Sequence, residues 1–391
     1  MAQVIRITGA KIALDAERTE RFDLTIAGTR ILPFDTKTKS ATELDLSDHL
    51  LLPGLINAHD HLEFSLFPRL GTGPYPNAAA WAEDIYHPNR SPIREHLSVT
   101  KPDRLPWGGI RNLLSGVTTV AHHNPCEPAI FNDRFPVRVL RRYGWAHSLA
   151  FSPDIADCWR RTPRSWPFII HAAEGADESA RAEIPRLKDA GWLDRRTVLV
   201  HAVGATSAAL EMVRESGASI VWCPSSNLFT LGRTLAPEIV RSGIPIALGT
   251  DSPLTGEGDL IDEIRSANLP AEEVYPLVTT GAASVLRLTN GEGTIRGHGV
   301  ADLVAVRDTG QTPARSLVDL RPELVMVRGR IMLLSENLAG RFARLRLRNF
   351  HRIRIEGRGS WRIRADVPRL YTSASQAIGP EVRLSGKRVC L

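Results

Sequence analysis

The 391-residue sequence contains only four cysteines, and none of them forms a C-x-x-C spacing. They are Cys126, Cys158, Cys223 and Cys390. In a chain of this length, scattered cysteines indicate reduced, mostly buried thiols in a cytoplasmic protein. The chain is also long enough to bury a large core without disulfides or a structural metal.

Long apolar runs are missing as well. No stretch approaches 18 apolar residues, so we expect no membrane span. Residues 1–7 do not place a basic segment before an apolar one, so we expect no secretory signal. Hydrophobic residues make up 43% of the chain and charged residues 24%, which is ordinary for a soluble folded protein.

Acidic residues are scarce in one segment only. From residue 341 onward the chain has 13 Lys and Arg but three Asp and Glu, a net charge of +10. The whole chain carries +6, so the first 340 residues carry −4. Residues 345–348 and 353–355 alternate apolar and basic side chains, which predicts strands with one solvated face. Because the segment lacks the aromatic series of a single-strand binding platform, we expect no nucleic-acid partner, and we expect residues 341–391 to fold against the body.

Short alternating strands are predicted at both ends of the chain. Residues 1–52 and 291–335 are expected to pair into one small β-sandwich-like domain, and residues 336–391 to form a basic C-terminal extension. The predicted strands are residues 4–7, 22–26, 43–46, 302–306, 324–327 and 329–331.

Between these segments, apolar runs alternate with helix-like segments. The runs are residues 50–57, 117–120, 168–170, 198–200, 219–222 and 244–248. Helix-like segments at 207–216 and 238–242 are each followed by a glycine, the expected helix stop. Strands that are apolar on both faces and alternate with helices predict a parallel α/β fold. We expect residues 53–290 to form a distorted (β/α)8 TIM barrel, with short or irregular units near 137–140 and 146–151.

Histidines and an aspartate follow several of these runs. His59 and His61 end the first run, and residues i and i+2 of an extended segment point to the same face. His171, His201 and Asp251 directly follow later runs. An isolated pair of histidines is more often packed or solvated, but packing does not explain five such side chains at strand ends. Barrel enzymes carry their chemistry at those ends.

The spacing of these residues predicts a metal site. His201 follows His171 by 30 residues and precedes Asp251 by 50, which corresponds to one and two strand–helix units. The side chains are therefore expected around one rim of the barrel. Imidazoles with a carboxylate suit zinc or iron(II) better than magnesium or calcium. An open position left for water is typical of a catalytic site.

This ordered set of motifs resembles the amidohydrolase superfamily, in particular its mononuclear-metal cytosine/guanine deaminase and chlorohydrolase branch. Each motif is weak alone, but the set in order is specific, and the resemblance covers about residues 1–335. The motifs are the opening strand at residues 52–62, and residues 171–174, 200–201, 223–227, 249–253 and 293–304.

The resemblance implies a role for each residue. Glu174 would move a proton from an activated water to the substrate nitrogen, and His201 would hydrogen-bond that water or the developing oxyanion. Asp251 would also share protons with the water. The alternatives are a helix N-terminal acid for Glu174 and a core histidine for His201. One divalent metal per chain, Zn²⁺ or Fe²⁺, would be held by His59, His61, His171 and Asp251.

Lysine is absent between Lys101 and Lys188. Binuclear members of the superfamily bridge their metals with a carboxylated lysine on the fourth strand, so we expect a single metal. His122 and His123 leave a second metal site open as an alternative.

The substrate contacts are less sharply defined. Residues 62–106 are expected to form a long loop that acts as a lid or binding element, with Trp81 stacking on a planar ring or packing within the loop. His122, His123 and His147 lie near strand ends and are pocket candidates, as is Asn227, whose alternative is a turn residue.

The expected function is a metal-dependent hydrolase that deaminates an amino-substituted nitrogen heterocycle. The alternative is hydrolysis of a cyclic amide, such as a hydantoin or lactam, or of an aryl halide at the same site. A nucleic-acid binder would leave the ligand set unexplained. We expect a small-molecule substrate and no membrane partner, and a homodimer is compatible with the sequence.

Overall fold

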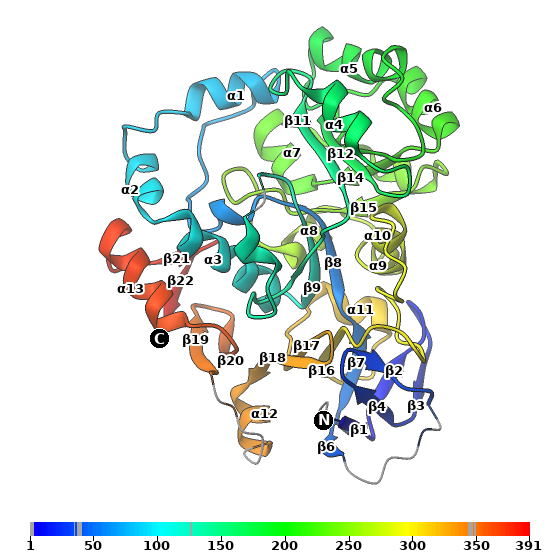
Figure 1. The fold of residues 1–391 in the computed structure, drawn as a ribbon, viewed down its shortest axis with the longest axis vertical. Helices are drawn as coiled ribbons and strands as arrows, with labels where there is room; N and C mark the ends of the chain where they lie inside the picture. Colours follow the sequence, from blue (N-terminus) through cyan, green and yellow to red (C-terminus); the bar gives the residue numbers. More distant parts are fainter. Residues whose placement is uncertain (1–3, 35, 37–40, 126, 343–346, 348) are drawn as a thin grey trace.

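The computed structural model describes residues 4–34, 36, 41–125, 127–342, 347 and 349–391. A parallel β core surrounded by helices lies above a long mixed sheet, as Figure 1 shows. In the described part of the chain, no helix is both long and apolar enough to cross a membrane. Of the three described cysteines, which are all free, only Cys223 is buried, so the expectation of mostly buried thiols is wrong for Cys158 and Cys390.

Eight parallel strands form the core, but they do not close into a barrel. They divide into sheets of order β10-β9-β8 and β11-β12-β13-β14-β15. Among the described residues, β10 has no ladder to β11, and a single bridge between Asp60 and Asp251 joins the end of β8 to the segment after β15. The predicted distorted (β/α)8 barrel is therefore present as an open, barrel-like core. The strands are β8 (Leu55–Asp60), β9 (Val117–His122), β10 (Arg138–Val139), β11 (Gly144–Ser148), β12 (Phe168–Ala172), β13 (Thr197–His201), β14 (Ser219–Trp222) and β15 (Ile246–Leu248).

The irregular region lies where the sequence predicted it. Strand β10 has only two residues, and no helix separates it from β11 among the described residues. A short 3₁₀ helix, η2 (Pro128–Phe131), replaces the helix expected between β9 and β10. The missing ladder between β10 and β11 follows from this short unit, since two residues provide few backbone groups for pairing.

The apolar run at 50–57 is two strands rather than one. β7 (His49–Pro53) pairs with the mixed sheet, and β8 begins at Leu55 and enters the core. The chain changes sheets at Gly54, where an added Cβ would lie 2.3 to 2.8 Å from side-chain atoms of Thr118. Only glycine permits this close approach, so Gly54 fixes the position at which the chain passes from one sheet to the other.

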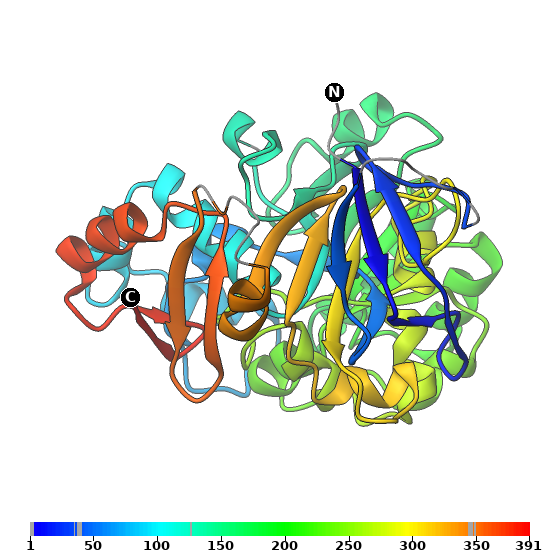
Figure 2. The same ribbon diagram turned by 90° about the horizontal axis from the view of Figure 1, so that it is seen from below.

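The mixed sheet brings both ends of the chain together, as Figure 2 shows. Its ten strands have the order β21-β22-β19-β20-β18-β17-β16-β7-β2-β3, and the expected pairing of N-terminal with C-terminal strands is present between β7 and β16. A four-stranded sheet of order β5-β4-β1-β6 lies beside it. The strands are β1 (Val4–Thr8), β2 (Lys11–Ala13), β3 (Thr19–Arg21), β4 (Leu24–Ala27), β5 (Arg30–Ile31), β6 (Thr42–Asp45), β16 (Leu303–Arg307), β17 (Leu324–Val327), β18 (Arg330–Ser335), β19 (His351–Ile355), β20 (Gly359–Ile363), β21 (Arg383–Leu384) and β22 (Lys387–Cys390).

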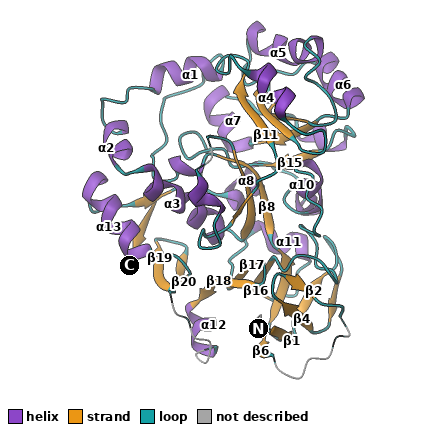
Figure 3. Ribbon diagram, in the orientation of Figure 1, coloured by secondary structure: helices purple, strands orange, loops and turns teal. Residues whose placement is uncertain are grey.

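Helices cover the core on its outer side (Figure 3). The segment 62–106, expected as a loop, is largely helical, because η1 (Leu62–Phe64), α1 and α2 lie within it and α3 begins there. The stop at Gly217 is confirmed, since it ends α6 in the left-handed region with φ 69°. The predicted helix at 238–242 is the 3₁₀ helix η3 (Pro237–Arg241). The α-helices are α1 (Ala78–Ile85), α2 (Ile93–Ser98), α3 (Lys101–Leu114), α4 (Ile155–Arg161), α5 (Glu178–Asp189), α6 (Ser207–Ser216), α7 (Pro224–Leu231), α8 (Leu260–Ser266), α9 (Ala271–Leu277), α10 (Thr280–Val285), α11 (Pro313–Val318), α12 (Glu336–Arg341) and α13 (Val367–Ile378).

A buried ion pair joins α3 to the end of β8. Arg111 donates to Asp60 Oδ1 at 2.6 Å, and both side chains are almost fully buried. Asn112 donates to the other carboxylate oxygen of Asp60 at 2.7 Å. Asp60 stands between His59 and His61, so this pair holds the strand end that presents both histidines.

Arg111→Met is therefore expected to destabilise the protein strongly. Removing the guanidinium leaves the carboxylate of Asp60 buried without its counter-charge, which costs about 3–5 kcal/mol. The free energy of unfolding in urea measures the effect. Arg6→Met is the matched control, because the side chains of Arg6 and its partner Asp23 are 40% and 39% exposed, and it should change that free energy much less. Equal losses in the two variants would contradict this account.

The basic C-terminal segment is packed onto the body. β20 pairs with β18, and α13 packs against α2 and α3 (Figure 1). Arg358, in the turn between β19 and β20, donates to Asp259 at 2.6 Å and to Asp262 at 2.8 Å. Asp259 caps the N-terminus of α8. The predicted strand at 345–348 lies almost entirely outside the described residues, whereas the one at 353–355 is part of β19.

We expect residues 351–391 to resist limited proteolysis as well as the core does, and Arg358→Ala to speed cleavage within this segment. The variant removes the contacts of the β19–β20 turn with the start of α8, so the segment opens more often. Arg383→Ala is the control, since Arg383 pairs with Glu381 of the same segment. Rapid removal of the segment from the unaltered protein, with the remainder intact, would show that it is not packed.

Candidate metal centre

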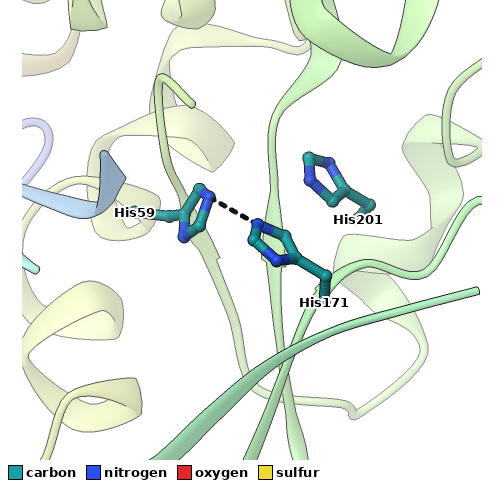
Figure 4. A group of neighbouring side chains, drawn as sticks. All are labelled: His59, His171 and His201. Atoms are coloured by element: carbon teal, nitrogen blue, oxygen red, sulfur yellow. Dashed lines mark hydrogen bonds between the residues drawn. The ribbon is translucent and has the colours of Figure 1, made fainter. Parts of the chain in front are cut away.

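The polar side chains at the carboxyl ends of the core strands meet in one cluster. His59 lies near the end of β8, His171 in β12 and His201 at the end of β13, and His61 and Asp251 follow β8 and β15. Figure 4 shows the rings of His59, His171 and His201 turned toward a common space. His201 and Asp251 have left-handed backbones, with φ 76° and 52°. Such strain, of order 1–3 kcal/mol per residue, is characteristic of functional sites.

The separations between donor atoms fit a tetrahedral metal ion. His59 Nε2 and His171 Nε2 are 3.2 Å apart, and Asp251 Oδ1 lies 3.6 Å from His59 Nε2 and 3.4 Å from His61 Nε2. Two donors about 2.0–2.1 Å from a shared zinc ion in tetrahedral geometry lie roughly 3.3–3.4 Å apart. Each of these three pairs is thus spaced as two donors to one ion are. The described donor atoms within 4.8 Å of one another include the groups His59–His171–His201 and His59–His61–Asp251, which share His59.

The hydrogen bonds on the outer side of the rings leave lone pairs facing inward. His171 Nδ1 lies 2.8 Å from the carbonyl oxygen of His147, so it carries the proton. His123 Nε2 donates to the carbonyl of Ala146 at 2.9 Å, which leaves its Nδ1 to accept from His59 Nδ1 at 3.2 Å. Neutral His59 and His171 thus present unprotonated Nε2 atoms to each other. A cation between them is the arrangement that stabilises this contact.

The imidazoles are buried in an environment that favours their neutral form. Burial lowers the pKa of His59 to about 3 and that of His201 to about 4, and it places the pKa of His171 well below its usual value. Burial would raise the pKa of Asp251, but the neighbouring side chains of His59, His61 and His201 hold that pKa well below the usual range. Neutral imidazoles and an ionised carboxylate are the protonation states in which these groups bind metal.

Glu174 stands beside this cluster on the loop after β12. Its Oε1 lies 3.5 Å from His201 Nε2, and one donor atom of each of Glu174, His201 and Asp251 lies within 4.8 Å of the others. Burial, with the neighbouring charges of Asp251 and Glu183, raises the pKa of Glu174 well above its usual value. A carboxyl with a raised pKa both accepts and returns protons near neutral pH.

Two residues that the sequence did not single out hold the carboxylate of Asp251. Ser226 Oγ donates to Asp251 Oδ2 at 2.7 Å, and Thr255 Oγ1 donates to the same oxygen at 3.1 Å. These bonds leave Oδ1 facing His59 and His61. Ser226 lies in the 223–227 motif, which was the one available signal, whereas Thr255 lies outside every motif.

The three histidines expected to line the substrate pocket lie in different surroundings. His123 is buried behind His59, and His122 is buried with Nε2 3.7 Å from Glu63. His147, in β11, is only partly buried, with its ring centroid 4.7 Å from that of His171. Burial lowers the pKa of His147 to about 4. Of the three, His147 has the most exposed side chain, so it is the one that a small molecule can reach most easily.

Asn227 and Trp81, also expected to contact substrate, have other partners. Asn227 is fully buried in α7, with Nδ2 2.8 Å from His201 Nδ1. Trp81, in α1, donates to the carbonyl of Leu70 at 3.0 Å. It packs against a small cluster of buried side chains, Phe67, Ile93 and Leu254.

Comparison with proteins of known sequence identifies the family. Residues 164–332 match the model of the amidohydrolase family. The 5-methylthioadenosine/S-adenosylhomocysteine deaminase of Pyrococcus horikoshii is 30% identical over 372 residues, covering 77% of this chain and 86% of the relative. The deaminase of the same name from Halobacterium salinarum is 25% identical, covering 78% of this chain and 84% of the relative. The resemblance inferred from the motifs is thereby confirmed.

Solved structures show the same fold. Zinc-bound atrazine chlorohydrolase from Arthrobacter aurescens aligns with a TM-score of 0.73 at 19% identity, covering 96% of this chain and 100% of that one. A zinc-bound adenosine deaminase from Xanthomonas campestris aligns with a TM-score of 0.69 at 19% identity, covering 96% and 97%. The chain belongs to the amidohydrolase family and is a metal-dependent hydrolase that acts on carbon–nitrogen bonds.

Proposed function

We propose that the chain is a hydrolytic deaminase that removes the exocyclic amino group of an adenine-like ring. The observation that carries this proposal is the position of Glu174, which lies 3.5 Å from His201 Nε2 and beside the donor atoms of the metal cluster. Loss of an amine from a tetrahedral carbon requires protonation of the departing nitrogen. A proton carrier next to the activated water meets that requirement.

We assign one divalent ion, Zn²⁺ or Fe²⁺, to His59, His61, His171 and Asp251. When bound, such an ion lowers the pKa of a coordinated water to about 7.

Each remaining group has a task that its surroundings support. Glu174 takes a proton from the attacking water and returns it to the leaving amino group. His201 donates a hydrogen bond to the oxygen on which charge develops, and Asp251 accepts a proton transiently. Because His123 and Asn227 are buried against the rings of His59 and His201, we assign them support of the site, and we assign substrate contact to His147.

The substrate class that we propose is a 5′-substituted adenosine. Two relatives that align over most of this chain are named as deaminases of 5-methylthioadenosine and S-adenosylhomocysteine. An adenine ring has a single exocyclic amine, and the cluster supplies one proton carrier for its departure.

Coupled measurement of ammonia release tests the proposal. We expect metal-loaded protein to release ammonia from 5-methylthioadenosine, S-adenosylhomocysteine or 5′-deoxyadenosine faster than from aminopyrimidines, pterins or aminotriazines. Release should stop after chelation and return when metal is restored. No ammonia from this panel, combined with turnover of a hydantoin, lactam or chlorotriazine, would overturn deamination in favour of the alternative hydrolysis.

A further inference from the structure

His201 differs from His59 and His171 in the partner of its outer ring nitrogen. His171 Nδ1 faces a carbonyl, which only accepts hydrogen bonds. His201 Nδ1 instead lies 2.8 Å from the side-chain amide of Asn227, and both residues are buried. The orientation of that amide therefore decides which nitrogen of His201 carries the proton.

The orientation of the Asn227 amide is set by the indole N–H of Trp222, a group that can only donate a hydrogen bond. Trp222 Nε1, at the end of β14, donates to Thr234 Oγ1 at 2.6 Å, and an indole N–H has no acceptor capacity. The Thr234 hydroxyl in turn donates to Asn227 Oδ1 at 3.4 Å. The amide oxygen thus faces Thr234, and the amide NH₂ donates to His201 Nδ1.

We propose that the chain Trp222–Thr234–Asn227 fixes His201 in the tautomer that carries its proton on Nε2. His201 then acts in the site as a hydrogen-bond donor and not as a metal ligand. This inference rests on the proposed function, because it assigns the donor that the deamination uses. It also excludes two of the three donor groups that the geometry of the described residues allows, His59–His171–His201 and Glu174–His201–Asp251, because both use His201 as a ligand.

The opposite tautomer conflicts with the same contacts. A proton on Nδ1 would oppose the NH₂ of Asn227 at 2.8 Å, so two donors would meet. Rotating the amide to relieve this would point its NH₂ at Thr234 and remove the acceptor of the Thr234 hydroxyl. With the proton on Nε2, His201 instead directs an N–H toward Glu174 Oε1, 3.5 Å away.

Zinc affinity distinguishes a donor from a ligand. We expect His201→Gln to bind zinc within a few-fold of the unaltered protein in competition with a chromophoric chelator. His171→Gln removes an assigned ligand and should weaken zinc by more than the roughly 10–100-fold that loss of a ligand's hydrogen-bond partner costs. Equal loss of zinc affinity in both variants would overturn the inference.

The ring protons report the tautomer directly. In the zinc-loaded protein with ¹⁵N-labelled histidine, and with His201→Gln for assignment, we expect a pyrrole-type Nε2 and a pyridine-type Nδ1 for His201. In Asn227→Asp, a carboxylate accepts from Nδ1, so the two ring nitrogens should exchange character. A pyrrole-type Nδ1 in the unaltered protein would contradict the proposal.

Kinetics separate positioning from general structural support. A wrong histidine tautomer costs roughly 10⁴-fold in kcat in the serine protease triad, and we expect Asn227→Asp to lose roughly 10²–10⁴-fold in kcat with little change in KM. Thr234→Val, which removes the hydroxyl, should also lower kcat, and Thr234→Ser should restore it. Equal rates for the Val and Ser variants would exclude the relay through Thr234.

These tests do not depend on the substrate. Zinc affinity and ring spectra are measured without turnover, so they assign the role of His201 even where no adenosine is deaminated. Silence in the ammonia screen, with a pyrrole-type Nε2 on His201, would overturn the proposed reaction and leave the tautomer established.

Discussion

Glu174→Gln is expected to lower kcat by roughly 10²–10⁴-fold while the metal content and the fold stay unchanged. Glutamine keeps the size of the side chain but cannot take a proton from water and return it to nitrogen. The partly buried position that raises the pKa of Glu174 makes this carboxyl an effective proton carrier, and its 3.5 Å contact with His201 places it at the site. Steady-state ammonia release, with metal analysis of the same sample, measures the effect.

Glu178→Gln is the matched control for this variant, because Glu178 is exposed at the start of α5. It should leave kcat unchanged. Activity of Glu174→Gln within a few-fold of the unaltered protein would show that a different group transfers the proton.

His171→Ala is expected to abolish both metal binding and activity. Elemental analysis of the unaltered protein should return about one zinc or iron per chain, since His59 lies close to His171 and to the pair His61–Asp251. Removing this imidazole takes away one assigned donor, so the remaining side chains hold the ion much more weakly. Metal that binds only the folded state also stabilises it, by about 4 kcal/mol at a free concentration 1,000 times Kd, so chelation should lower the Tm of the unaltered protein.

His87→Ala is the control, because His87 lies exposed between α1 and α2. It should keep both metal and activity. Full metal content in His171→Ala would disprove the assigned ligand set. Two metals per chain in the unaltered protein would return attention to His122 and His123 as a second site.

The cluster was predictable from the sequence because one geometric rule governs it. Side chains at the carboxyl ends of parallel strands converge, so apolar runs that end in His59, His171 and His201 predict a common site. The supporting contacts were not predictable in this way. Ser226, Thr255 and Thr234 reach the site through tertiary contacts with residues of other elements, and no local spacing marks such contacts.

The fold could also be predicted only in part. Strand positions followed from apolar runs, but their assignment to sheets did not, because a run that is apolar on both faces has the same appearance in a core and in a mixed sheet. The division at Gly54 depends on the nearby side chain of Thr118, which lies on β9. In the segment 62–106, prolines and aromatics hide the helical periodicity of α1 and α2, so the sequence predicts a loop there.

The passage of the chain at Gly54 has a consequence for the order of folding. β7 leads directly into β8, the strand that carries His59. The antiparallel neighbour of β7 is β16, in which Arg307 pairs with His49. During synthesis from the N-terminus, β7 has no such neighbour until residue 307 has been made. Pairing over so large a sequence separation is slow, because a long loop must close before any contact forms. Strand β2 is made earlier and can pair with one edge of β7. The nascent chain therefore leaves the other, β16-facing edge of this apolar strand unpaired for most of its synthesis, and that edge is where premature aggregation would begin.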